Sequence, residues 1–454
     1  MSTLHVDLDL IRKYNVPAPR YTSYPPATRF AELASGDVLE RVRADYQSTR
    51  DLSLYFHLPF CRSLCWFCGC TTVITTKQES SATYLDYLDR EIAFMAKMLN
   101  PKRKVAQLHF GGGTPTFLKP DEIRRLGQVI RSHFTYANDI EAGVEIDPRR
   151  VVRDQITALR DAGFSRASLG VQDFNPVVQK AINRIQSKEE TEKTIEWLRE
   201  DGFTSLNIDL IYGLPHQTVS SFEQTLDEVL KLKPDRFAIF NYAHVPWLKP
   251  AQKILKILPT PEVKLEMLKH TVEHLTSRGY DYIGMDHFAR HDDELAVAQR
   301  NKSLQRNFQG YSTRGETDIY AFGMSSISQT NDAYWQNQKE LPKYYEALDS
   351  NLSPIAKGYF LTEDDKIRRQ VIMRLMCDMS MDYVSLSKIL GVDFSSYFQD
   401  ELNSLSGLEA DGLIKTHETG LIVTELGRLL IRNIAIRFDA YNASGTASRF
   451  SKSI

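Results

Sequence analysis

Long apolar runs and cysteines are scarce in this 454-residue chain. No stretch approaches about 18 uninterrupted apolar residues, so the sequence predicts no membrane-spanning helix and no membrane partner. The N-terminal sequence MSTLHVDLDLIRKYN lacks the basic start and the apolar run of a signal peptide, which favours a cytoplasmic location. A large excess of either charge is also absent, because 56 lysines and arginines nearly balance 58 acidic residues. That balance gives no electrostatic reason to expect nucleic acid as a partner.

Only five cysteines occur, and four of them lie within the segment CRSLCWFCGC (61–70). This crowding is unlike the disulfide framework of a secreted protein. A structural zinc site would commonly need a second C-x2-C pair, which the chain lacks, and a thioredoxin-like dithiol would need only two cysteines. The spacing of Cys61, Cys65 and Cys68 instead suits three ligands of a four-iron cluster, with structural zinc as the alternative. The isolated Cys377 is predicted to be a core thiol.

Six short, nearly continuous apolar segments alternate with amphipathic helical patterns from residue 52 onward. Such segments are typical of parallel strands that are covered on both faces, and the alternation indicates repeated βα units. The sequence therefore predicts an α/β fold with a partial (β/α)6 barrel. The predicted strands are residues 52–60, 105–113, 143–148, 166–174, 206–215 and 236–244.

The chain divides into four predicted parts. Residues 1–50 form an N-terminal extension that we expect to cover the site, and residues 51–290 form the barrel. Residues 291–355 form a connecting segment that contributes to the site. Residues 356–454 form a mainly helical C-terminal domain, in which the helix–hairpin–helix pattern of residues 408–435 resembles a winged helix.

Cysteine and polar residues gather where the predicted strands end. In parallel barrels the active site forms at the carboxyl ends of the strands, so one site is predicted there. The residues concerned are the four clustered cysteines, GGGTP (111–115), Glu145, Asp147, Gln172, Asp209 and NYAH (241–244).

Several of these residues also have a purely structural interpretation. The three carboxylates could pair with covering helices, since a carboxylate in an apolar strand costs free energy unless it is paired or ligand-bound. The GGG turn could be a plain tight connection, and Arg184, in INRIQ, could be a solvated helical arginine. His57 and His109 lie on predicted strands and could be core histidines with satisfied nitrogens.

The cysteine spacing, with Phe67 directly before Cys68, resembles the C-x3-C-x-(aromatic)-C hallmark of the radical S-adenosylmethionine superfamily. From about residue 15 to its end, the chain is also similar to the oxygen-independent coproporphyrinogen III oxidases. The matching segments are PRYTSYP (19–25), HLPFCRSLCWFCGC (57–70), HFGGGTPT (109–116), GVQDFN (170–175), NIDLIYGLP (207–215), FNYAH (240–244), GMDHFAR (284–290), NFQGY (307–311) and GRLLIRN (427–433).

This resemblance implies an enzyme of haem biosynthesis that converts two propionate side chains of coproporphyrinogen III to vinyl groups without molecular oxygen. The product would be protoporphyrinogen IX, and the reaction would use a 5′-deoxyadenosyl radical. The implied cofactors are a 4Fe–4S cluster and two S-adenosylmethionine molecules per reaction, and the implied partner is a small reductant protein such as flavodoxin or ferredoxin. We expect a monomer. The alternative is a related haem-binding or haem-delivery protein without oxidase activity, and Cys70 with the PRYTSYP segment favours the enzyme.

The resemblance also implies roles for single residues. Cys61, Cys65 and Cys68 would ligate the cluster. The residues lining the first S-adenosylmethionine would be Tyr55, Gly112, Glu145 and Ile327, and those around the second Phe67, Gly113, Thr114, Gln172, Arg184, Asp209 and Ala243. Cys70 and Glu145 are the predicted catalytic residues, with Cys70 in proton or hydrogen handling near the substrate; the alternative for Cys70 is a small buried residue without function. The candidates for binding substrate carboxylates are Arg20, Arg290 and Arg306.

Overall fold

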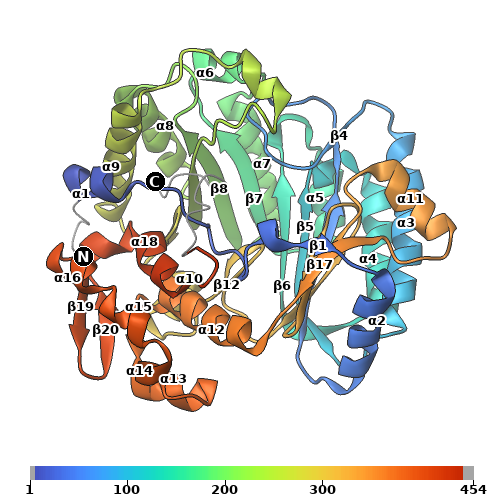
Figure 1. The fold of residues 1–454 in the computed structure, drawn as a ribbon. Helices are drawn as coiled ribbons and strands as arrows, with labels where there is room; N and C mark the ends of the chain where they lie inside the picture. Colours follow the sequence, from blue (N-terminus) through green and yellow to red (C-terminus); the bar gives the residue numbers. More distant parts are fainter. Residues whose placement is uncertain (1–5, 443–454) are drawn as a thin grey trace.

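Six neighbouring parallel strands form the centre of a 13-stranded sheet in the computed structural model, which describes residues 6–442 (Figure 1). They stand in chain order across the sheet, and each pairs in parallel with the next. The strands are β2 (Leu52–Leu58), β5 (Lys104–Gly112), β6 (Thr135–Ile146), β7 (Arg166–Gln172), β8 (Ser205–Tyr212) and β9 (Arg236–Asn241). All six overlap the predicted segments, so the partial parallel barrel is confirmed.

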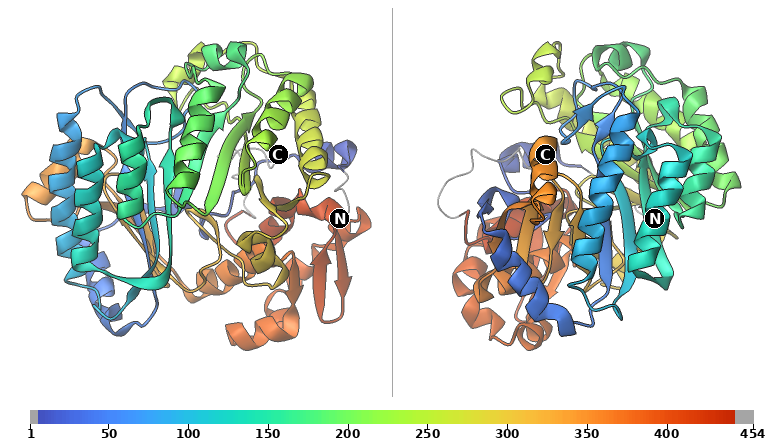
Figure 2. Two further views of the ribbon diagram at one scale, coloured as in Figure 1. Left: turned by 180° about the vertical axis from the view of Figure 1, so that it is seen from behind. Right: turned by 90° about the vertical axis from the view of Figure 1, so that its right-hand side faces the viewer.

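Helices cover the outer face of these strands (Figure 2). They are α3 (Glu79–Ala96), α4 (Pro120–His133), α5 (Arg153–Asp161), α7 (Lys188–Glu200), α8 (Val219–Lys231) and α9 (Pro261–Thr276). Local sequence sets where they begin: Ser187 and Glu190 exchange side chain–backbone hydrogen bonds of 3.1 and 2.9 Å in a capping box before α7. Thr260 caps α9, whose first residue is Pro261. No helix in residues 6–442 is long and apolar enough to cross a membrane.

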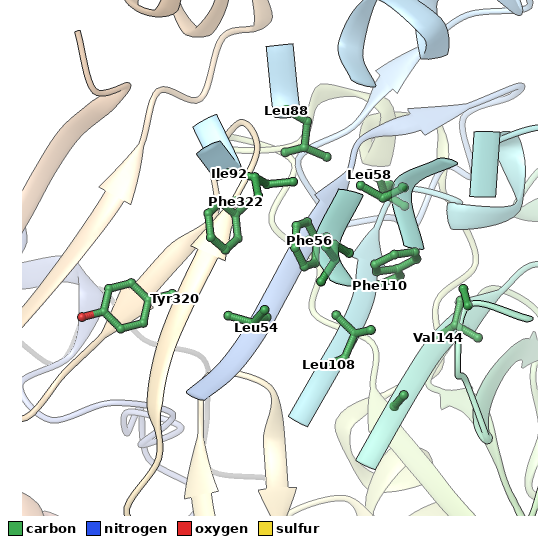
Figure 3. Close-up of a cluster of buried hydrophobic side chains, with 14 of the residues drawn as sticks. Leu54, Phe56, Leu58, Leu88, Ile92, Leu108, Phe110, Val144, Tyr320 and Phe322 are labelled. Carbon is green, nitrogen blue, oxygen red and sulfur yellow. The ribbon is translucent and has the colours of Figure 1, made fainter. Parts of the chain in front are cut away.

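The two faces of each strand differ, because successive side chains of a strand point to opposite sides. Leu54, Phe56 and Leu58 of β2 are buried and pack among apolar residues of β5 and α3 (Figure 3). Tyr55 and His57 alternate with them and therefore face the inside of the barrel. The inner face thus carries polar groups that are available for chemistry.

Shorter strands, which the sequence did not predict, extend the sheet at both edges. β14 (Asp318–Phe322) lies parallel to β2. The antiparallel strands are β15 (Ile327–Gln329), β16 (Ala333–Asn337), β17 (Ile355–Phe360) and β1 (Ala31–Glu32) beyond β14, and β11 (His287–Arg290) and β10 (Tyr280–Gly284) beyond β9. They have two to six residues and do not repeat the strand–helix alternation, which is why the periodicity missed them.

The N-terminal segment packs against the C-terminal part of the chain. After α1 (Leu8–Tyr14), the carbonyls of Ala18 and Pro19 accept hydrogen bonds from Arg432. The C-terminal part contains α12 (Glu363–Asp378), β18 (Ser380–Asp382), α13 (Tyr383–Leu390), α16 (Ser406–Ala410), β19 (Ile414–His417), β20 (Gly420–Val423), α17 (Glu425–Arg428) and α18 (Ile431–Ala435). The β19–β20 hairpin between short helices has the predicted winged-helix-like order. Cys377 on α12 is fully buried, as predicted for a core thiol.

Candidate active site

The cysteine loop leaves the barrel at the end of β2 and is held at several points. β3 (Phe60–Cys61) pairs with β4 (Val73–Ile74) and closes the loop at its base. The backbone N–H of Trp66 donates to the carbonyl of Ile182 at 3.0 Å. Asn183 Nδ2 donates to the carbonyl of Leu64 at 2.8 Å. The loop is therefore tied both to its own strand and to the connection that follows β7.

The four thiols of this loop differ in exposure and in acidity. Cys65 is buried, Cys61 and Cys68 are half-buried, and Cys70 is exposed. A hydrogen bond from the Cys70 thiol lowers the pKa of Cys68 to about 6, and the same bond raises the pKa of Cys70. The backbone N–H of Cys70 also lies 3.4 Å from Cys68 Sγ. Cys68 is therefore a thiolate near neutral pH, the form that binds metal, while Cys70 keeps its proton.

Two arginines lie beside Cys65. Arg149 Nη2 and Arg184 Nη1 are each 3.6 Å from its Sγ, and both also contact Asp147, at 2.6 and 3.3 Å. Each guanidinium can donate a hydrogen bond to this sulfur. Arg184 is buried in the turn after α6 (Pro176–Ala181), which excludes the solvated helical arginine. Asp147 is ion-paired, but its partners lie in the short 3-10 helix Pro148–Arg150 and in the loop after α6, not on a covering helix.

The chemistry of these thiols fits an iron–sulfur cluster. In the described part of the chain, residues 6–442, no three His, Cys, Asp or Glu side chains are arranged to hold a single metal ion. A four-iron cluster takes each thiolate at a different iron atom, so its ligands do not have to converge on one point. Burial raises the pKa of Cys61 to about 11, but a coordinating metal deprotonates a thiol.

The GGGTP segment packs directly against the cysteine loop. The N–H of Gly113 donates to the carbonyl of Leu58 at 2.9 Å. Gly112 has a φ of +108°, and a Cβ added there would lie 2.5 Å from the His57 ring. A Cβ added at Gly113 would lie 2.5 Å from the backbone of Pro59. Glycine is required by this close approach, so the segment is more than a plain connection.

Inner-face residues of β2, β5 and β6 form a group around Glu145. Its carboxylate accepts a hydrogen bond from the Gly112 N–H at 3.1 Å and lies 3.5 Å from His109 Nε2. Burial raises the pKa of Glu145, but the hydrogen bonds from His109 and Gly112 outweigh burial and hold that pKa below its usual value. Tyr55 stacks on His109 with ring centroids 5.9 Å apart. Glu145 is therefore ionised, and these partners belong to the site rather than to a covering helix.

His57 is a buried histidine with contacts at both ring nitrogens, as expected for a core histidine. Its Nε2 lies 2.9 Å from the Thr71 carbonyl and 3.3 Å from Ser325 Oγ, and its Nδ1 lies 3.1 Å from Tyr55 OH. Burial lowers the pKa of His57. The residue ties β2 to the cysteine loop and to the turn after β14.

Gln172, Arg184 and Asp209 come together at the ends of β7 and β8. A Cβ added at Gly170 would lie 2.9 Å from Gln172 Nε2 and 3.1 Å from Arg184 Nη2, which places those two side chains next to each other. Asp209 accepts hydrogen bonds from two polar neighbours on β7 and β8, at 3.0 and 2.7 Å. Burial, followed by the charge of a neighbouring carboxylate, raises the pKa of Asp209 to about 7.

The remaining predicted cofactor residues lie around this centre. Thr114 Oγ1 is 3.4 Å from Cys61 Sγ. Phe67 lies on the cysteine loop and packs with the buried cluster that includes Tyr242. Ala243 is exposed just beyond the end of β9, and Ile327 is the first residue of β15. The roles predicted for Ala243 and Ile327 rest on the resemblance alone.

Two of the three candidate arginines for substrate carboxylates come together. Arg306 is buried, and its Nη2 donates to the carbonyl of Arg20 at 3.3 Å, whereas its Nε and Nη1 have no hydrogen-bond partner among the described residues. Arg20 forms an ion pair with Asp286. Burial, together with both guanidinium groups, lowers the pKa of His287 to about 3. Arg290 is exposed and pairs with a neighbouring aspartate at 2.9 Å, so it does not join this group.

Two arginines that contact the predicted site residues or the segment carrying Arg20 were not predicted from the sequence. Arg149 lies two residues after Asp147 in DPRR (147–150), and that proximity was the available signal. Arg432 lies on α18, and its pKa is lowered to about 10 by burial and by the charge of Arg20. No local pattern connects Arg432 with the N-terminal segment that it contacts.

Comparisons with known proteins cover nearly the whole chain. The family model of the radical SAM superfamily matches residues 55–229, and that of the HemN C-terminal domain matches residues 361–430. The chain is 49% identical over 437 residues to the oxygen-independent coproporphyrinogen III oxidase of Escherichia coli (strain K12), with 96% of this chain and 95% of that protein covered. It is 46% identical over 459 residues to the oxidase of the same name from Pseudomonas aeruginosa, with 100% of both covered. The solved structure of coproporphyrinogen III oxidase (HemN) from Escherichia coli, a radical SAM enzyme, superposes with a TM-score of 0.92 at 47% identity, covering 97% of this chain and 100% of that one.

Proposed function

Because the chain belongs to the oxygen-independent coproporphyrinogen III oxidases of the radical S-adenosylmethionine superfamily, we propose specific roles for the residues at the carboxyl ends of its strands. Its activity is the oxygen-independent oxidation of coproporphyrinogen III in haem biosynthesis. Two propionate side chains each lose carbon dioxide, one hydrogen atom and one electron and become the vinyl groups of protoporphyrinogen IX. One observation carries the assignment of the site: three thiols on one fixed loop lie against the glycine segment that donates a backbone N–H to Glu145.

We assign the cluster to Cys61, Cys65 and Cys68. The superfamily implies a 4Fe–4S cluster and S-adenosylmethionine, which together supply a 5′-deoxyadenosyl radical when bound. The low pKa of Cys68 and the arginines beside Cys65 support thiolate ligands at these positions. The backbone N–H of Cys70 lies 3.4 Å from Cys68 Sγ, and this position beside a cluster ligand supports proton or hydrogen handling by Cys70.

We assign a first S-adenosylmethionine to the side of the site around Glu145. The ionised carboxylate suits the ammonium group of the methionine moiety, and the glycine segment allows close approach of the backbone. The proposed contacts are Tyr55, Gly112, Glu145 and Ile327.

We assign a second S-adenosylmethionine to the side of the site at the ends of β7 and β8. Two bound molecules would provide one for each propionate. Gln172, Arg184 and Asp209 lie together there, and Arg184 Nε has no hydrogen-bond partner among the described residues. An unpartnered buried donor of this kind supports a polar ligand, since buried polar groups are nearly always paired. The proposed contacts are Phe67, Gly113, Thr114, Gln172, Arg184, Asp209 and Ala243.

We assign substrate carboxylates to Arg306 and Arg20. Coproporphyrinogen III carries four carboxylates, and arginine binds carboxylates through paired N–H donors. The buried guanidinium of Arg306 has two donor nitrogens without a partner in the described residues, which supports an anionic ligand. We further propose that the enzyme works as a monomer and takes its electrons from a small reductant protein.

The function is tested by anaerobic reconstitution with iron and sulfide, followed by S-adenosylmethionine, a chemical reductant and coproporphyrinogen III. We expect protoporphyrinogen IX, with two methionines released for each product. One methionine per product would contradict the assignment of two S-adenosylmethionines per reaction. Methionine release without any vinyl product would instead favour a haem-delivery protein.

A further inference from the structure

Residues 245–257, between β9 and α9, expose an unusual amount of apolar surface. Trp247, Leu248, Ile254 and Ile257 are 74%, 69%, 52% and 71% exposed. In Figure 1 this yellow-green segment lies near α6, at the same end of the barrel as the cysteine loop. Large apolar side chains gathered on one exposed segment mark an interaction site more often than chance exposure does.

The same segment is attached to the cysteine loop by hydrogen bonds. Lys249 Nζ donates to the carbonyl of Cys70 at 2.9 Å. Gln252, which is buried, donates from Nε2 to the carbonyl of Phe67 at 3.1 Å. Leu255 lies in the apolar cluster against which Phe67 packs. A protein that covered residues 245–257 would therefore lie next to the loop that carries the three cluster thiols.

The charge of the segment is uniformly positive. Residues 245–257 contain Lys249, Lys253 and Lys256 and no acidic residue, whereas the whole chain has a formal charge of −2. None of these lysines forms an ion pair with another described residue within 4.0 Å. Lys253 and Lys256 are exposed. Exposed apolar side chains interspersed with lysines favour an acidic partner, because complementary charge guides two surfaces together.

We propose that residues 245–257 form the docking surface for an acidic one-electron donor protein. This inference rests on the proposed function, in which a cluster on the cysteine loop has to receive electrons from outside the chain. In each encounter the donor is oxidised by one electron and the cluster is reduced by one, with no atom transferred. The electron enters through the loop to which Lys249 and Gln252 are bonded.

Two variants of exposed residues test the proposal, each with a matched control on α13. Lys253→Glu/Lys256→Glu reverses charge, and Trp247→Ala/Leu248→Ala removes apolar surface. Lys388→Glu and Ile389→Ala are the controls, since both residues are exposed in a different element. The probe is an acidic flavodoxin, studied in two ways: binding of its oxidised form by calorimetry, and cluster reduction by its reduced form in stopped flow. Dithionite replaces flavodoxin in a parallel series.

We expect both double variants to weaken flavodoxin binding and to slow flavodoxin-driven cluster reduction by about tenfold or more. Charge reversal should also remove most of the salt dependence of the rate, while dithionite-driven reduction and both controls stay unchanged. Unchanged binding and rate in both variants would overturn the proposal. An equal loss of the reduction rate with dithionite would overturn it too, because residues 245–257 would then affect cluster reduction without a protein donor. Failure of the wild-type enzyme to form product with dithionite would instead refute the proposed function and leave the binding result standing.

Discussion

Cys68 and Cys70 lie two residues apart, yet the pKa values of their thiols are shifted in opposite directions. The hydrogen bond between them lowers the pKa of Cys68 to about 6 and raises the pKa of Cys70. The backbone N–H of Cys70 also lies 3.4 Å from Cys68 Sγ, so Cys70 lies directly beside a proposed cluster ligand. A proton held at an exposed position beside the cluster ligands is suited to transfer.

We expect Cys70→Ser to keep the cluster and to lower the formation of vinyl product by about 100-fold, within the range of general acid–base contributions. Iron and sulfide analysis would measure the cluster, and chromatography would measure the product. The matched variant Cys68→Ser should lose bound iron. Loss of iron in Cys70→Ser would show that Cys70 is a ligand and that the proposed role is wrong.

Arg306 offers a second prediction at the scale of single residues. Arg306→Met should raise the KM for coproporphyrinogen III by about tenfold or more, because a charge-assisted hydrogen bond contributes roughly 1.5–3 kcal/mol. The Tm of the substrate-free protein should change little, since the replaced group is a buried charge with two unpartnered nitrogens. Arg290→Ala, at an exposed ion pair, is the control and should leave the KM unchanged.

Arg20→Ala should also weaken substrate binding while leaving the cluster intact. The Arg20→Ala variant is a less specific test of substrate binding, because it also leaves Asp286 without its arginine partner.

A large fall in Tm for Arg306→Met with an unchanged KM would contradict the assignment of Arg306 to substrate.

At the scale of elements, Glu91 joins α3 to the turn after β14. Its carboxylate accepts hydrogen bonds from the N–H of Gly323 (2.8 Å), from Asn337 Nδ2 (2.6 Å) and from Tyr344 OH (2.7 Å). The same turn carries Ser325, whose hydroxyl lies 3.3 Å from His57 Nε2. Glu91 therefore supports the site from outside the barrel.

The pH dependence of stability should change in Glu91→Gln. Burial raises the pKa of Glu91 to about 7. Because this folded-state pKa lies above the unfolded value, the stabilising contribution of Glu91 is complete below about pH 4.5 and is lost as pH rises through about 7. Relative to wild type, the Tm of the variant should therefore rise between pH 5 and pH 8, by the equivalent of at most about 3 kcal/mol. A Tm difference that stays constant over this range would contradict the prediction; Glu340→Gln, at an exposed pair, is the control.

The elements differ in how readily the sequence predicts them. The six parallel strands were found because each is a nearly continuous apolar run followed by an amphipathic helix. β14 to β17 were missed because they are short and follow one another without helices between most of them. Their place in the sheet depends on pairing with β2 and with one another, which no local pattern encodes.

At the scale of the whole molecule, the two ends of the described chain hold each other in place. Arg432 donates to the carbonyls of Ala18 and Pro19, 414 and 413 residues away in sequence. Tyr21 OH donates to Asp439 at 2.9 Å. The N-terminal segment that carries Arg20 is therefore positioned by the C-terminal part of the chain.

We expect Arg432→Met to loosen this contact. Leaving the two carbonyls without their donor should cost about 1–3 kcal/mol. Limited proteolysis with mass spectrometry should then detect faster cleavage near residues 15–30, and the KM for coproporphyrinogen III should rise together with it. Lys415→Met, at an exposed position of β19, is the control. Equal cleavage rates in wild type and Arg432→Met would contradict the role of this contact.

How much of the site the sequence predicted also depends on scale. The cysteines were identified from their own spacing, because cluster ligands require one residue type at short range. The glycine segment was identified from its place after a predicted strand and from the resemblance. Contacts between distant residues were not predicted: Arg149 lies beside Cys65, Ser325 beside His57 and Arg432 beside Pro19 only because of the fold. The predicted domain boundaries remain predictions.

The separation of Cys377 from the other cysteines has a practical consequence for handling the protein. Cys377 is fully buried in α12, whereas all other thiols lie on one loop. An alkylating reagent applied to the folded protein without oxygen should therefore tag loop positions only. Iron would shield three of these, so mass spectrometry should count at most one tag on a loaded chain and up to four on an empty one. The ratio of the two species would report the loading of a preparation without any assay of turnover.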